Sequence, residues 1–138
     1  MISSEHSEMR TSLSLRVKGV NLDRDAISAF MGRSPTHFHK AGDARVGRSG
    51  RHYAPFRSDL WEFEYCAESD VAFESQLALL LATIDAENLR RLYDEGCTAD
   101  IFAGVFLGDN GSGSIVLPRD IVAQLSTLGL TLEVSIYG

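Results

Sequence analysis

The segment that most constrains the fold is residues 12–18, in which apolar and polar side chains alternate strictly. Leu13, Leu15 and Val17 share one face of the extended chain, and every residue between them is polar. A strand with one apolar and one polar face is typical of an antiparallel or mixed sheet, because the strands of a purely parallel sheet are buried on both faces. The sequence therefore predicts a sheet that covers a core on one side and meets water on the other.

Periodicity and capping residues predict the remaining elements. Further strands are expected over residues 60–67, 100–107, 114–117 and 130–137, and helices over residues 22–31, 69–84, 85–96 and 118–129. Asn21 or Asp23 is expected to cap the first helix, and Asp85 the third. The sequence GDNGSG at residues 108–113 predicts a turn that joins two strands as a hairpin. Residues 33–58 show no period and contain several glycines and prolines, which predicts a long loop.

The order of these elements, a β-α-β unit, two helices and then a β-β-α-β unit, indicates an α+β fold. We expect a two-layer sandwich in which helices cover one face of a mixed or antiparallel sheet. The runs Arg24-Asp25 and Arg119-Asp120 both begin a helix that lies between two strands, so the sandwich is predicted to be ferredoxin-like with an inserted helical pair. Residues 1–138 are expected to form a single domain with a flexible N-terminal tail at residues 1–11.

Composition favours a globular protein of the cytoplasm. Apolar residues make up 44% of the chain and charged residues 23%, which is unlike a disordered or fibrous protein. The polar N-terminus does not resemble a signal peptide, and the longest apolar run, residues 77–84, is too short to cross a bilayer. Cys66 and Cys97 are expected to be buried free thiols, as in a reducing compartment. We therefore expect a cytoplasmic protein with no membrane contact.

Several short signatures, taken in order, resemble a known bacterial family. They are the runs SLRVKG at 14–19, SPT at 34–36, KAGD at 40–43, ADI at 99–101 and LEVSIY at 132–137, with Trp61 opening a strand between them. Over residues 13–137 the chain is similar to the bacterial domain-of-unknown-function family 4279. The resemblance departs over residues 44–58, which are longer and richer in arginine than the family pattern. It implies an α+β fold and a bacterial, cytoplasmic setting, and it implies no activity.

Charge is distributed unevenly along the chain. Residues 33–58 carry a net charge of +5, whereas the whole chain carries −6, so the other residues carry −11. Arginines in this segment could bind phosphate, carboxylate or an acidic partner; alternatively, the segment folds over the acidic body or stays solvated. Binding to nucleic acid is not expected, because a protein with an isoelectric point near 5.1 repels a polyanion.

Histidines and aromatic residues lie in or beside the same segment. His37 and His39 are two residues apart, which places both rings on one side of an extended chain, as in some transition-metal sites. No metal site is predicted, since the remaining ligands, Asp43 and His52, lie in the same irregular segment. The aromatic stripe that begins at Trp61 is expected to pack in the core, with partner contact as the alternative. Glu62 and Glu64 are expected to be solvated.

No motif of a known enzyme class or cofactor site is present, and no cofactor is predicted. The sequence favours a non-enzymatic cytoplasmic interaction module that binds another protein or, through residues 130–137, a second copy of itself. Immunity proteins, whose acidic surfaces bind basic toxins, are one such class. The alternative is a protein, including an enzyme, that binds an anion or small ligand through residues 33–58. The predicted contact residues are Arg45, Arg48, Arg51, His37, His39, His52 and Trp61.

Overall fold

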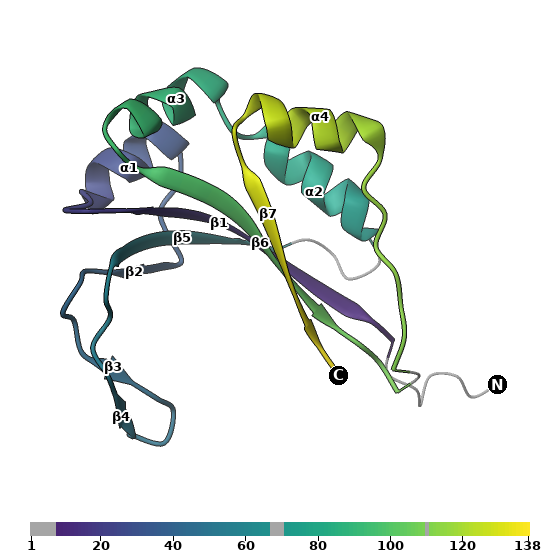
Figure 1. The fold of residues 1–138 in the computed structure, drawn as a ribbon, viewed down its shortest axis with the longest axis horizontal. Coiled ribbons are helices and arrows are strands. Elements are labelled where there is room, and N and C mark those ends of the chain that lie inside the picture. The colour runs from purple at the N-terminus through teal and green to yellow at the C-terminus, as the bar shows by residue number, and fades with distance from the viewer. Residues whose placement is uncertain (1–7, 67–70, 110) are drawn as a thin grey trace.

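The computed structural model describes residues 8–66, 71–109 and 111–138. Its main feature is a twisted five-stranded sheet, and the four helices of the described residues all lie on one side of it (Figure 1). The two-layer α+β sandwich that the sequence predicts is therefore confirmed. One face of the sheet is covered by helices; we call the opposite face the open face.

The described residues form seven strands and four helices. In chain order they are β1 (Arg10–Gly19), α1 (Arg24–Met31), β2 (His37–His39), β3 (Arg45–Val46), β4 (His52–Tyr53), β5 (Asp59–Tyr65), α2 (Phe73–Ala82), α3 (Ala86–Asp94), β6 (Thr98–Phe106), α4 (Arg119–Thr127) and β7 (Thr131–Tyr137). The sheet has the strand order β2-β5-β1-β6-β7, and β3 and β4 form a separate hairpin. All neighbouring strands are antiparallel except β6 and β7, which run parallel, so the sheet is mixed.

The strict alternation of β1 places its apolar residues under the helices. Leu13, Leu15 and Val17 are each at most 1% exposed, and they lie in register with the apolar faces of β5 and β6. The helices cover this face with buried leucines, each of which contributes about 1.5–3 kcal/mol by leaving water. These are Leu77, Leu80 and Leu81 of α2 and Leu89 and Leu92 of α3. The core therefore lies between β1 and the inserted helical pair.

Two of the helices, α1 and α3, begin at aspartate caps that the sequence predicts. Asp23 caps α1, since its carboxylate accepts hydrogen bonds from the amides of Asp25 and Ala26 at 3.0 and 3.1 Å. Asp85 caps α3 in the same way, through the amide of Asn88 at 2.9 Å. These caps satisfy amides at the helix start that have no partner within the helix. The predicted start of α2 at residues 69–70 lies outside the described residues, and α2 begins at Phe73.

The two halves of the sheet differ in topology. Strands β6 and β7 are parallel neighbours joined through α4. The strands that flank α1 are β1 and β2, which also run parallel to each other, but β5 lies between them and pairs antiparallel with both. Helices α2 and α3 are inserted between β5 and β6, as expected. Both helices with the similar starts, α1 and α4, therefore connect two parallel strands, and the two β-α-β units differ in that a third strand lies between the strands around α1.

Two sequence predictions are wrong, one of a long loop and one of a strand. Residues 33–58 are not a single long loop, because β2 joins the edge of the sheet and β3 pairs with β4. These strands have only two or three residues, too few to produce a visible period. The strand predicted over residues 114–117 is also absent; residues 112–118 form an extended connection to α4. Its three consecutive apolar residues suit such a connection as well as a strand.

Smaller corrections concern the strand ends and the cysteines. β1 begins at Arg10, inside the tail predicted over residues 1–11, of which residues 1–7 lie outside the described residues. Cys66 is exposed, not buried, because β5 ends one residue before it; Cys97 is partly buried. No helix in the described parts of the chain is long and apolar enough to cross a membrane.

Candidate functional site

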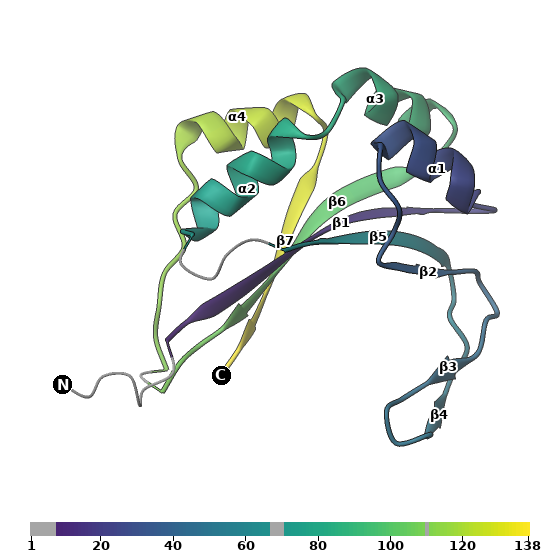
Figure 2. The same ribbon diagram turned by 180° about the vertical axis from the view of Figure 1, so that it is seen from behind.

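A hairpin projects from the sheet on the side away from the helices (Figures 1 and 2). We call residues 41–57 the arm. Its base is closed by hydrogen bonds from the Gly42 amide to the Phe56 carbonyl (2.8 Å) and from the Phe56 amide to the Asp43 carbonyl (3.2 Å). Its tip is a turn at residues 47–51, in which Gly50 has a left-handed φ of 81°. Backbone hydrogen bonds therefore define the arm along its length.

One buried carboxylate anchors the arm to the sheet. Asp59, the first residue of β5, is 4% exposed. It accepts hydrogen bonds from the Ala41 amide (2.6 Å) and the Leu22 amide (2.8 Å), and its carboxylate lies 2.9 Å from the Lys40 ammonium. The Lys40 ammonium also donates to the Leu22 carbonyl at 2.8 Å. This group, the Asp59 anchor, joins the start of the arm, the end of the arm and the turn after β1.

The same contacts make the anchor sensitive to acid. The hydrogen bond from Ala41 first, then those from Lys40 and Leu22, lower the pKa of Asp59 from 3.8 to about 2, while burial acts in the opposite direction. A lowered pKa stabilises the fold at a pH above the unfolded value, and this stabilisation is lost as the pH falls towards the folded value. We expect the difference in unfolding free energy between the wild type and Asp59→Asn to shrink between about pH 4 and pH 2. Urea unfolding of both proteins across this range measures it; a constant difference would contradict the assignment.

Six basic residues give residues 33–58 their positive charge, and they divide into two groups. Arg33 and Lys40 have structural roles: Arg33 donates to the Thr83 carbonyl at 2.9 Å, and Lys40 belongs to the anchor. The other four are exposed and form no ion pair with any described residue: Arg45, Arg48, Arg51 and Arg57. The arm therefore does not fold over the acidic body, and its arginines face solvent.

Aromatic rings hold two of these guanidinium groups. Arg45 and Arg51 both lie over the ring of Tyr53, at 5.5 and 5.4 Å from its centroid, and Arg45 also lies 5.8 Å from the Phe56 ring. A cation near the face of an exposed ring gains about 0.5–1 kcal/mol. The arginines are thus partly ordered on the arm although no carboxylate binds them.

The other predicted contact residues lie in different places. His37 and His39 are on β2, with the ring of His39 stacked on Phe56 at 3.5 Å, and His52 is exposed on β4. Trp61 is fully buried under the helices and donates to the Ser28 hydroxyl at 3.1 Å. Its prediction as a contact residue needs correction, since its place on the apolar face of β5 removes it from any partner surface.

Sequence reasoning missed a contact between β2 and β5. His37 pairs in register with Glu62, and its Nε2 atom lies 2.9 Å from a carboxylate oxygen of Glu64. One nitrogen of His37 and one oxygen from each glutamate lie within 4.8 Å of one another. The alternation in residues 60–67 indicated that Glu62 and Glu64 share a face, but no local pattern indicated that residue 37 pairs beside them.

A separate ion-pair group occupies the other half of the open face. Arg16 on β1 forms two hydrogen bonds to Asp100 on β6, at 2.7 and 2.9 Å, and one to Glu133 on β7, at 3.1 Å. Burial opposes the charge of this guanidinium, yet its acidic partners raise the pKa of Arg16 overall. Arg16 is the residue opposite Glu62 in register, but its charge is directed to Asp100 and Glu133.

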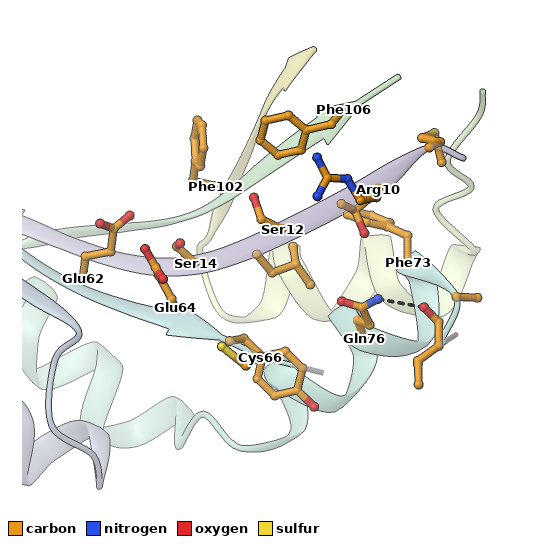
Figure 3. Close-up of a pocket in the computed structure, with 16 residues that line it drawn as sticks. Arg10, Ser12, Ser14, Glu62, Glu64, Cys66, Phe73, Gln76, Phe102 and Phe106 are labelled. Carbon is orange, nitrogen blue, oxygen red and sulfur yellow. Dashed lines mark hydrogen bonds between the residues drawn. The ribbon is translucent and has the colours of Figure 1, made fainter. Parts of the chain in front are cut away.

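Two hollows adjoin the open face. The larger, about 750 Å³, lies where β5 ends, between Ser14 and Phe102 of the sheet and Phe73 of α2 (Figure 3). The smaller, about 580 Å³, lies between β2 and the base of the arm. Glu62 lines both hollows. None of the four exposed arm arginines lines either one.

The outer edge of β7 is a second exposed feature. β7 is the last strand in the sheet order, so its outer edge has no strand beside it among the described residues. Its apolar side chains are covered by α4 only at the start of the strand, and Ile136 is 66% exposed. Tyr137 stacks on Phe106 at 4.9 Å. An uncovered apolar edge strand of this kind can pair with another chain.

Comparison with protein families gives a match over nearly the whole chain. A family model described as a domain of unknown function, DUF4279, matches residues 7–138. The chain belongs to the DUF4279 family. No curated protein and no solved structure matches it. Membership in DUF4279 confirms the resemblance seen in the sequence but transfers no residue role to this DUF4279 chain.

Proposed function

We propose that this chain is a non-enzymatic protein-interaction module that binds an acidic segment of another protein through its arm. The supporting observation is the set of arm arginines, which are exposed and have no carboxylate partner among the described residues. A guanidinium group binds a carboxylate through two parallel hydrogen bonds, so an acidic segment is the chemistry that complements them. The proposal includes a cytoplasmic location.

The alternative, an anion or small-ligand binder, has less support. A small ligand is normally enclosed by convergent polar groups in a cavity. The basic side chains that line the hollows are Arg10 in the larger one and His37 and His39 in the smaller one, whereas the arm arginines are spread along a projecting hairpin. Such a spread suits an extended partner. The immunity-like version, with an acidic surface for a basic toxin, also has less support, because the exposed acids of the helices are interspersed with Arg24, Arg90, Arg91 and Arg119.

The test compares two variants with the same change in net charge. One replaces Arg45, Arg48 and Arg51 with Ala, and the control replaces Arg24, Arg90 and Arg119, which are exposed on helices. Exposed ion pairs contribute about 0.2–1 kcal/mol each, so losing three should weaken binding about tenfold. The measurement is fluorescence anisotropy with a labelled polyglutamate peptide at low salt. We expect the arm variant to lose affinity, the control to keep it, and both to unfold at wild-type temperature.

Capture from cell lysate then extends the test to a natural partner. The wild type and the control should retain one protein with an acidic segment, and the arm variant should lose it. Equal binding of polyglutamate by the arm variant and the control would contradict the proposal, since net charge alone would then explain the affinity. Capture of only a second copy of this chain, unaffected by the arm substitutions, would instead support self-association through the edge of β7.

A further inference from the structure

Three side chains that can bind a metal ion converge on the open face next to β2. His37 and Glu62 are cross-strand partners, and Glu64 lies two residues further along β5 on the same face. One donor atom from each residue lies within 4.8 Å of the other two. Three ligands around a tetrahedral ion such as Zn²⁺ lie roughly 3.4 Å apart, given bond lengths near 2.1 Å. Because both carboxylates end flexible side chains, small rotations are sufficient to close this difference.

The charge around these residues favours a cation. The cross-strand neighbour of Glu62 on β1 is Arg16, which is held by Asp100 and Glu133, and Glu64 faces Ser14, a neutral residue. Among described residues, His37 is the only basic group that an ion pair connects to either glutamate. Two neighbouring carboxylates that form no ion pair with a Lys or Arg among the described residues repel each other, and a divalent ion removes this repulsion.

The backbone holds the three residues in place without a metal. Two hydrogen bonds of Thr36 fix the start of β2 on β5. The Thr36 backbone amide donates to the Glu62 carbonyl at 2.7 Å, and the Thr36 hydroxyl accepts from the Glu64 amide at 2.9 Å. His37 follows directly, so its ring is positioned above the glutamates. This is the arrangement of a site on rigid strands rather than on a loop.

We propose that His37, Glu62 and Glu64 form a binding site for one divalent transition-metal ion. One imidazole and two carboxylates match Zn²⁺, which accepts nitrogen and oxygen ligands and, with three protein ligands, retains an open position. That position faces the hollows that Glu62 lines. In the bound state the ion contacts His37 Nε2, and the neutral ring carries its proton on Nδ1. The site does not depend on the arm arginines.

A bound ion would also change the edge of the sheet. β2 has three residues and, within the described part of the chain, pairs only with β5. An ion that bridges His37 to both glutamates adds a cross-link between these two strands, and binding to the native state alone must raise its stability. Metal binding should therefore appear both as a binding heat and as a higher melting temperature.

The experiment is calorimetric titration of the untagged protein with zinc chloride, carried out in a Cys66→Ser background because Cys66 is an exposed free thiol and thiols are zinc ligands. We expect one saturable site and a rise in melting temperature. His37→Gln and the double variant Glu62→Gln/Glu64→Gln should each weaken binding at least tenfold and abolish the rise. His39→Gln is the matched control, since His39 lies on the same strand but stacks on Phe56, and it should bind as the parent does.

Three results would overturn the proposal. They are the absence of saturable heat in the parent protein, binding that survives both ligand variants, and an equal loss in His39→Gln and His37→Gln. Circular dichroism of each variant before titration establishes that it is folded. All the substituted side chains except Glu62 and His39 are exposed, and these two are partly exposed, so we expect little change in stability without metal.

Discussion

Asp59→Asn is expected to lower the free energy of unfolding by about 2–4 kcal/mol, because a buried group that holds a cation and two amides is replaced by one that holds them poorly. The carboxamide is nearly the same size but carries no charge, so Lys40 loses its ionic partner. In the wild type the Leu22 and Ala41 amides donate to different carboxylate oxygens of Asp59. The carboxamide nitrogen of Asn cannot accept a hydrogen bond, so one of these two amides loses its acceptor. Urea unfolding near neutral pH measures the loss.

The control for this substitution is Asp43→Asn. Asp43 also accepts a hydrogen bond from the chain at residue 40, at 2.8 Å, but it is exposed, and we expect a loss below about 1 kcal/mol. Hydrogen exchange gives a second measurement, since Asp59→Asn should accelerate exchange of the amides at the base of the arm and leave those of β6 protected. An unfolding free energy within about 0.5 kcal/mol of wild type would contradict the role of Asp59 as an anchor.

Trp61→Ala is expected to cost about 3–5 kcal/mol, which is typical of removing a large buried aromatic side chain. Trp61 is fully buried opposite Val17 on the helix face of the sheet, and its indole nitrogen donates to Ser28 on α1. Since it is the only tryptophan, unfolding of this variant is followed by far-ultraviolet circular dichroism.

Trp61→Phe keeps most of the apolar volume and should cost less than Trp61→Ala. It provides a folded variant if Trp61→Ala is too unstable to purify. Tyr53→Ala on the exposed arm is the surface control and should change the unfolding free energy by no more than about 1 kcal/mol, the size of the ring–cation contacts it removes. A loss from Trp61→Ala as small as that from Tyr53→Ala would contradict burial of Trp61.

The parts of the fold that could be predicted from sequence are those with a long regular pattern. The alternation in β1 and β5 and the aspartate caps of α1 and α3 each determine local structure directly. Strands β2, β3 and β4 could not be predicted, because two or three residues do not establish a period and their pairing depends on distant partners. The run at 115–117 shows the converse error, since its apolar side chains were assigned to a strand although the backbone there has no strand partner among described residues.

The candidate site was predictable only at the level of composition. The excess of arginine in residues 33–58 was visible, but the sequence does not distinguish Arg33, which binds the end of α2, from Arg48, which faces solvent. The contact between His37 and Glu64 joins residues 27 positions apart. It depends on the register between β2 and β5, which a single sequence does not contain.

The placement of two arginines over Tyr53 affects the entropy of binding. A free arginine side chain loses rotational freedom when it contacts a partner, at a cost of about 0.5–1.5 kcal/mol. Arg45 and Arg51 already share one aromatic platform, so part of this freedom is lost when the arm folds. Tyr53 would therefore increase the affinity for an acidic partner through the two arginines that it orders, and variants that remove only the arginines would not reveal this role.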